Sequence, residues 1–305
     1  MPPPPASRPD RILRGIGSMI VCVTLFSIVH ILVKSLASRY PIVQIMFFRS
    51  ALALVPALVL IARHPRGFAL LRTRRPRAHA ARSMLGMFAM ATMFAAFRYL
   101  PAADVVAINF AAPLFVTALS VPLLREPVGM RRWTAVLVGF VGVLVMLQPG
   151  SIRAGDHALL GSMLALASAM AYAFVVIVIR QMSRDEPSLT IVVVYMTCVA
   201  TATGAVLPFV WMTPTAVDLA VFVAVGLVGG FAQVFLTRAF EAAPPAVVMP
   251  FEYLSLVVTA LLAWVIWTET PGGLTMVGAA IVIASGLFIL YREARLARVK
   301  PPSAP

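Results

Sequence analysis

Charged residues are scarce in this chain of 305 residues, in which Asp, Glu, Lys and Arg make up 12% and hydrophobic residues 61%. The mean hydropathy is +0.95. A soluble domain needs a more polar surface, with about 25% charged residues, so the composition excludes a soluble enzyme or binding module. Apolar runs of about 20 residues can cross a hydrocarbon core of about 30 Å as helices, and the runs are continuous rather than alternating. The sequence therefore predicts an all-α integral membrane protein.

Residues that build catalytic or metal centres are also few: there are 2 Cys, 4 His and 11 acidic residues. Cys22 and Cys198 lie in separate apolar runs, which gives no CxxC motif and no reason to expect a disulfide. Asp185-Glu186 is an adjacent acidic pair on a short loop, and the histidines are scattered. We therefore expect no metal, no cofactor and no enzymatic activity. The alternative is an integral-membrane enzyme acting on lipid, which needs clustered carboxylates or histidines.

The chain carries one stretch twice, at residues 98–127 and 238–271. Both copies begin with Arg and an aromatic residue, cross an Ala-Ala pair and enter a long apolar run. Each run contains a proline, Pro113 or Pro250, and ends at a Glu followed by another proline. An offset of about 140 residues is too long for a solenoid repeat, so the pattern indicates a duplicated half-protein.

Ten membrane spans are expected, five in each half. They fall at residues 15–34, 41–62, 80–98, 103–124, 132–148, 158–180, 187–210, 216–237, 245–267 and 273–291. The organisation that follows is a disordered cytoplasmic tail at 1–14, a first repeat at 15–148, a linker at 149–157, a second repeat at 158–291 and a cytoplasmic tail at 292–305.

The net charge of +14 is explained by topology rather than by nucleic acid. Most of the 25 Lys and Arg residues fall in alternate loops, with seven of them between Arg63 and Arg82. This positive-inside bias places both termini in the cytoplasm. Because five spans per half is an odd number, the two repeats enter the membrane from opposite sides and are inverted. Inverted repeats are typical of secondary transporters, with a substrate site near the midplane between the repeats.

Several segments carry a family resemblance: FFRS at 47–50, the stretch 98–127, GGFAQVFLTRAFEAAPPAVVMPFEY at 229–253 and GAAIVIASGLFILYRE at 278–293. Together they resemble the drug/metabolite transporter superfamily in its ten-helix EamA form. The resemblance implies a carrier of small organic metabolites whose cavity is lined by the first, third, fourth, sixth, eighth and ninth helices. In one departure, relatives commonly have Gly before the glutamate that ends the fourth and ninth helices, where this chain has Arg125 and Thr268.

Polar residues deep within spans mark candidate binding positions, because ionisable groups there normally face a cavity or a partner. Glu252 lies about seven residues into the ninth span, beside Tyr253, and both are candidate substrate-binding residues together with Gln233. A carboxylate at that depth suits a cationic solute or a transported proton, although a structural role with Gln233 is the alternative. Arg49 lies about nine residues into the second span and could bind substrate or clamp helices. Asn109 is equally consistent with substrate binding and with hydrogen bonding between helices.

Two further residues complete the expected substrate site. His30 on the first helix could bind ligand or carry a proton, and packing is its alternative. Tyr172, midway along the sixth helix, is the aromatic residue expected against substrate. A buried Glu with aromatic neighbours favours an S-adenosylmethionine-like solute, with amino-acid-like and riboflavin-like solutes or exported metallophores and drugs as alternatives.

The remaining expectations concern setting and partners. The sequence predicts a multi-pass protein of a bacterial inner membrane that works by alternating access. Its partners are a small-molecule substrate and membrane lipids, with no nucleic acid, and homodimer formation stays open. No ATP-binding motif is present, so transport is downhill or driven by an ion or proton gradient.

Overall fold

The computed structural model describes residues 9–73, 75–112, 114–116, 118–119, 130–147, 156–182, 186–242 and 249–299, and their regular secondary structure is helical. The first half contributes α1 (Pro9–Ala37), α2 (Ile42–Ala62), η1 (Gly67–Leu71), α3 (Pro76–Ala96), α4 (Ala102–Asn109) and α6 (Met130–Leu147). The second half contributes α7 (Asp156–Met182), α8 (Ser188–Val210), α9 (Ala216–Ala242), η2 (Met249–Tyr253), α11 (Leu254–Trp267) and α12 (Gly273–Val299). Each of the ten expected spans coincides with helix in this set, which confirms the all-α prediction.

The outer surface of the bundle suits a membrane. Five described helices are long and apolar enough to cross one, and four shorter apolar helices accompany them. On α6, Leu137, Val138, Val141 and Leu144 are each more than half exposed. A soluble monomer rarely exposes such a continuous apolar face, so these side chains are suited to lipid contact.

Two helices extend beyond the expected spans. α1 begins at Pro9 and α12 continues to Val299, so parts of the segments 1–14 and 292–305, predicted as tails, are helical. Hydropathy marks only the portion that lies in hydrocarbon. A helix satisfies its own backbone hydrogen bonds in water as well, so it can continue into the aqueous phase without an apolar sequence.

Contacts between helices repeat the internal duplication. Exchanging the two repeats exchanges α1 with α7, α2 with α8, α3 with α9, α4 with α11 and α6 with α12. Helix α1 packs along α9, and its exchanged pair, α3 with α7, also packs closely. The helices of the pairs α2–α8, α4–α11 and α6–α12 are also in contact. Exchanging the two repeats leaves each of these three pairs unchanged. This pattern is the one expected for two repeats related by a pseudo-two-fold axis.

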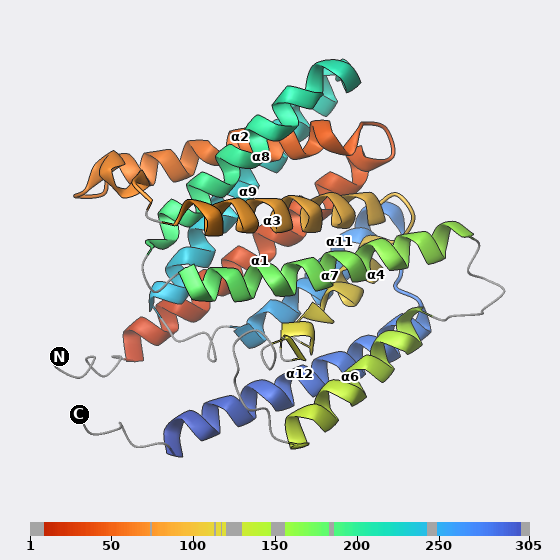
Figure 1. The fold of residues 1–305 in the computed structure, drawn as a ribbon. Helices are drawn as coiled ribbons and strands as arrows, with labels where there is room; N and C mark the ends of the chain where they lie inside the picture. The colour runs from red at the N-terminus through yellow and green to blue at the C-terminus, as the bar shows by residue number, and fades with distance from the viewer. Residues whose placement is uncertain are drawn as a thin grey trace, which may run out of the picture.

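The α6–α12 pair forms one edge of the bundle (Figure 1) and depends on glycine at the point of closest approach. A Cβ atom added at Gly278 would lie 2.5 Å from the carbonyl oxygen of Gly142. Small residues allow helix backbones to approach closely in membranes. The pair is therefore a packed scaffold, as expected for the final helix of each repeat.

The fourth and ninth spans are interrupted rather than continuous helices. α4 ends at Asn109, and the ninth span begins as the 3-10 helix η2 before continuing as α11. Asn109 precedes Pro113 by four residues, and a proline ring clashes with the carbonyl at that spacing, although Pro113 itself lies outside the described residues. Both interruptions leave a polar residue, Asn109 or Glu252, beside irregular backbone.

The end of α11 explains the Thr268 departure. Thr268 has a positive φ of 58° and caps α11 in the left-handed conformation. Its amide donates to Trp264 O at 2.8 Å, and the Glu269 amide donates to Ala263 O at 3.4 Å. The bond from the Thr268 amide to Trp264 O is that of the αL cap, in which Gly is usual because a Cβ atom strains the turn. Thr268 therefore forms a left-handed cap without glycine, and Arg125 lies outside the described residues.

Candidate functional site

The site is described relative to two ends of the bundle. The first residues of α1 and the last of α12 lie at one end, here the termini end (Figure 1). The loops after α1 and α11 lie at the opposite, far end, where Lys34 forms an ion pair with Glu269.

Glu252 lies at the centre of a small polar cluster near the termini end. Its half-buried carboxylate is close enough to interact electrostatically with the thiol of Cys22 on α1 and the hydroxyl of Tyr172 on α7. Tyr172 is 45% exposed, which fits a side chain that lines a space rather than one packed in a core. The structure therefore brings together two of the predicted site residues, Glu252 and Tyr172, from opposite repeats.

Asn109 takes part in hydrogen bonds between helices. Its Nδ2 donates to Val105 O at 3.1 Å, and Ser168 of α7 donates to its Oδ1 at 3.3 Å. The Ser168 hydroxyl also lies 2.9 Å from Ala89 O on α3. The bonding of Asn109 matches the alternative of hydrogen bonding between helices, and its place at the broken end of α4 keeps it near the candidate site.

Tyr253 packs between elements. Its ring meets Phe110 edge to face at a centroid distance of 5.1 Å. A Cβ atom added at Gly286 of α12 would lie 2.1 Å from its hydroxyl oxygen. These contacts tie the broken fourth and ninth spans to the α12 scaffold, so Tyr253 holds the backbone that presents Glu252.

Arg49 and His30 form a second group. Arg49 of α2 lies beside Gly229 of α9, where an added Cβ atom would be 3.9 Å from its Nε. It interacts electrostatically with His30 of α1, whose ring lies 5.8 Å from that of Phe97. The second helix was expected outside the cavity lining, yet its Arg49 side chain reaches between α1 and α9.

Gln233 lines a small cavity of about 10 Å³ between α2, α8 and α9, with Ala53 and Met196 among the other lining residues. Its role in binding substrate or in holding Glu252 stays a prediction.

Sequence reasoning missed Arg82 and Tyr195. Arg82 was counted among the loop residues that set topology, because the third span was expected to begin at residue 80. α3 instead begins at Pro76, where proline is favoured as the first helical residue. Arg82 therefore lies two turns inside the helix, 8% exposed, with its guanidinium 4.0 Å from the ring centroid of Tyr195. The proline was the signal that could have located it.

The far end is closed by polar contacts. Asp218 at the start of α9 accepts hydrogen bonds from Tyr40 at 2.8 Å and Thr215 at 2.9 Å, and pairs with Arg39 at 2.9 Å. The hydrogen bond to this carboxylate raises the pKa of Tyr40. Arg98 donates to the carbonyls of Ala37 and Tyr40.

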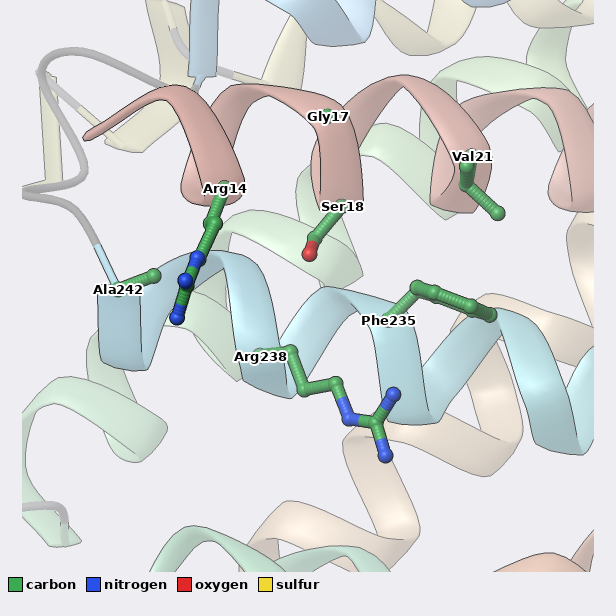
Figure 2. Close-up of a pocket in the computed structure, with 7 residues that line it drawn as sticks. All are labelled: Arg14, Gly17, Ser18, Val21, Phe235, Arg238 and Ala242. Atoms are coloured by element: carbon green, nitrogen blue, oxygen red, sulfur yellow. The ribbon is translucent and has the colours of Figure 1, made fainter. Parts of the chain in front are cut away.

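The termini end is open between the same two helices. A cavity of about 620 Å³ lies between α1 and α9 (Figure 2) and is lined by Arg14, Gly17, Ser18, Val21, Phe235, Arg238 and Ala242. A small apolar cluster of Met19, Cys22, Val23 and Ala239 lies next to it. Cys22 of this cluster is also within electrostatic range of Glu252.

Among the described residues, no group of three or more His, Cys, Asp or Glu side chains could hold a metal ion. The polar groups within the spans are single residues that come from several helices. The fold is that of a polytopic helical membrane protein built from two repeats.

Comparison with known proteins names the class. The model of the EamA-like transporter family matches residues 13–148 and 159–291, and the chain belongs to this family. It is 30% identical over 284 residues to an S-adenosylmethionine uptake transporter of Rickettsia prowazekii, covering 92% of this chain and 94% of that protein. It is 29% identical to a riboflavin transporter of Rhizobium johnstonii, covering 96% of each chain.

A third relative is an exporter. The pseudopaline exporter of Pseudomonas aeruginosa is 28% identical, covering 90% of this chain and 95% of that protein. A crystal structure with 19% sequence identity matches 95% of this chain with a TM-score of 0.63, which supports the fold. The chain is therefore a small-metabolite transporter of the drug/metabolite transporter superfamily.

Proposed function

We propose that this protein carries an S-adenosylmethionine-like metabolite, cationic and zwitterionic, across a bacterial inner membrane by alternating access, without changing it chemically. The observation that carries the proposal is the Glu252 carboxylate. It lies within electrostatic range of the Tyr172 hydroxyl of the other repeat, and no described basic side chain forms an ion pair with it. A carboxylate within a membrane span favours a cationic partner.

Two relatives with this architecture support the choice of substrate class. S-adenosylmethionine has a sulfonium and an ammonium group for Glu252 and an adenine ring for Tyr172. Riboflavin offers an aromatic ring system but no cation. Glu252 therefore favours the first substrate class over the second.

The test is uptake of labelled S-adenosylmethionine into proteoliposomes. Glu252→Gln keeps the shape and removes the charge, and it should lower uptake about 30-fold or more, as expected when a buried charge pair loses one member. Glu252→Asp is the matched control and should retain part of the activity. Uptake by Glu252→Gln equal to wild type would remove this residue from the mechanism.

Two further readouts address the alternatives. Mass spectrometry of the vesicle lumen should recover S-adenosylmethionine unchanged, whereas a modified product would indicate an enzyme. Uptake of riboflavin in place of S-adenosylmethionine would overturn the proposed substrate class.

The proposed orientation has its own test. Reporter fusions at Arg75, Arg131 and Pro305 should be cytoplasmic, and fusions at Ala154 and Pro214 should lie outside the cytoplasm. With this orientation the termini end is the cytoplasmic side, so the cavity between α1 and α9 faces the cytoplasm. An external signal at Pro305 would reverse the assignment.

A further inference from the structure

Arg82 is an unusual residue for a membrane helix. It is 8% exposed, and its Nε and Nη1 atoms have no hydrogen-bond partner among the described residues. The guanidinium lies over the ring of Tyr195, whose hydroxyl donates to Gly86 O at 3.3 Å. A Cβ atom at Gly86 would lie 2.2 Å from Arg82 Nη1, so glycine leaves the space in which the guanidinium is placed.

Arg49 supplies a second cation nearby. Its Nη1 atom is buried and also has no hydrogen-bond partner among the described residues. Arg49 and Arg82 are close enough to repel each other electrostatically, and both interact with Tyr195. The two side chains come from α2 and α3 and converge on the same tyrosine of α8.

No described acidic side chain compensates this pair. The ion pairs that the described residues form include Lys34 with Glu269 and Arg39 with Asp218, and neither involves Arg49 or Arg82. Removing a cation from water costs several kcal/mol, and two neighbouring cations add repulsion. Guanidinium groups donate hydrogen bonds and accept none. The unpaired Arg49 and Arg82 nitrogens are therefore complementary to an anion.

We propose that Arg49 and Arg82 form an anion subsite that binds the carboxylate of the transported solute. The proposal rests on the proposed function, because it gives the same solute its second point of attachment. Guanidinium groups present planar sets of donors that suit carboxylates.

Tyr172 connects the two points. It interacts electrostatically with Glu252 and with Arg82, so both charges lie within electrostatic range of one aromatic side chain. A solute that carries a carboxylate, a cation and a flat ring suits these three side chains. An amino-acid moiety with a cationic substituent has these features, and riboflavin, which has no ionised group at neutral pH, has not.

The first experiment compares paired competitors. Uptake of labelled S-adenosylmethionine into proteoliposomes is measured against unlabelled S-adenosylmethionine and against decarboxylated S-adenosylmethionine. In wild type, unlabelled S-adenosylmethionine should inhibit uptake at a concentration about tenfold or more lower than decarboxylated S-adenosylmethionine does, as for other charge-assisted pairs. Arg49→Gln and Arg82→Gln should remove most of this preference, and Arg82→Lys should keep part of it. Arg77→Gln, on the exposed face of the same helix, is the matched control and should behave as wild type.

The second experiment needs no transport. In detergent, wild type should be stabilised by L-methionine more than by L-methioninol, which lacks the carboxylate, and either Arg→Gln variant should lose the difference. Without ligand, Arg82→Gln should melt at or above the wild-type temperature, because one uncompensated charge has been removed. A purely structural arginine held by Tyr195 predicts a lower melting temperature.

The outcomes separate the two proposals. Equal competition by both competitors, with Arg→Gln variants that behave as wild type, overturns the anion subsite and leaves the proposed function standing. Absence of S-adenosylmethionine uptake overturns the proposed function, and the anion subsite is then decided by the melting experiment. The anion subsite is overturned if ligand-free Arg82→Gln melts at a lower temperature than wild type and if methionine and methioninol stabilise wild type equally.

Discussion

At the far end of the α1–α9 pair, a single carboxylate, that of Asp218, joins Arg39, Tyr40 and Thr215. At the termini end of the same pair, contact is made by Met19, Cys22, Val23 and Ala239, beside a cavity of about 620 Å³. Hydrogen bonds and ion pairs are directional, and those that share one acceptor are lost together when that acceptor is removed. Apolar contacts are non-directional and can be remade after the helices slide.

The difference indicates which end is closed in this structure and how each end could open. The far end is held by directional bonds, so opening it needs their simultaneous loss. The termini end carries a cavity beside an apolar cluster. A carrier that alternates access needs one end closed while the other is open, and the two ends provide that asymmetry with different chemistry.

The largest effect is expected from Asp218→Ala, which removes the common acceptor of the far end. The accessibility of this end is measured with the reporter substitution Ala37→Cys in a Cys198→Ser background, because Ala37 is 0% exposed. Its labelling by a membrane-impermeant maleimide should rise about tenfold or more, because hydrogen bonds to a charged group are lost together. Labelling of the native Cys22 at the termini end should fall in the same variant. Unchanged labelling at both positions would contradict the comparison.

A smaller effect is expected from Lys34→Met, which leaves Glu269 without its partner. The two side chains are 13% and 32% exposed, so the cost lies between that of surface and buried pairs, at about 1–2 kcal/mol. The melting temperature in detergent should fall. It should be restored when Lys34→Glu is combined with Glu269→Lys, and failure of this exchange would show that charge pairing is not what holds the contact.

Val23→Ala tests the termini end. Val23 is 4% exposed, and loss of two buried methyl groups should cost about 1.5 kcal/mol. Labelling of Cys22 should rise while labelling at position 37 stays constant. High salt should leave this effect unchanged but weaken the contribution of the far-end ion pairs. Equal salt dependence at the two ends would mean that they do not differ in chemistry.

The smallest effect is expected from Thr268→Gly. Thr268 holds a left-handed conformation that costs a residue with a Cβ atom about 1 kcal/mol, and glycine removes this strain. The variant should melt at a slightly higher temperature and keep the Lys34–Glu269 contact. A lower melting temperature would show that the threonine side chain contributes more than the turn costs.

Much of the fold was predictable because hydropathy in a membrane is read almost directly from the chain. Ten apolar runs, the duplicated stretch and the parity of five spans per half predicted the helical spans and their arrangement as two inverted repeats. Helix ends were predicted less well, since α1 and α12 continue past their apolar segments.

The candidate site was predictable only in part. Glu252 and Tyr172 could be proposed because a charged or aromatic residue stands out within an apolar run, and the two lie within electrostatic range of each other. Arg82 was missed because it lies close to a basic loop and is indistinguishable there from a topology signal. The roles proposed for Glu252, Tyr172 and Gln233 stay predictions.

The sequence by itself determined the type of the helices and the duplication of the fold, because burial of backbone hydrogen bonds in lipid leaves a helical chain few alternatives. Only the tertiary structure decided which helices pair and which polar residues meet. Arg49, Arg82 and Tyr195 come from three different helices, and their convergence depends on the rotation of each helix about its axis. That rotation is set by close packing at small residues such as Gly86 and Gly226, which no count of apolar residues along the chain can specify.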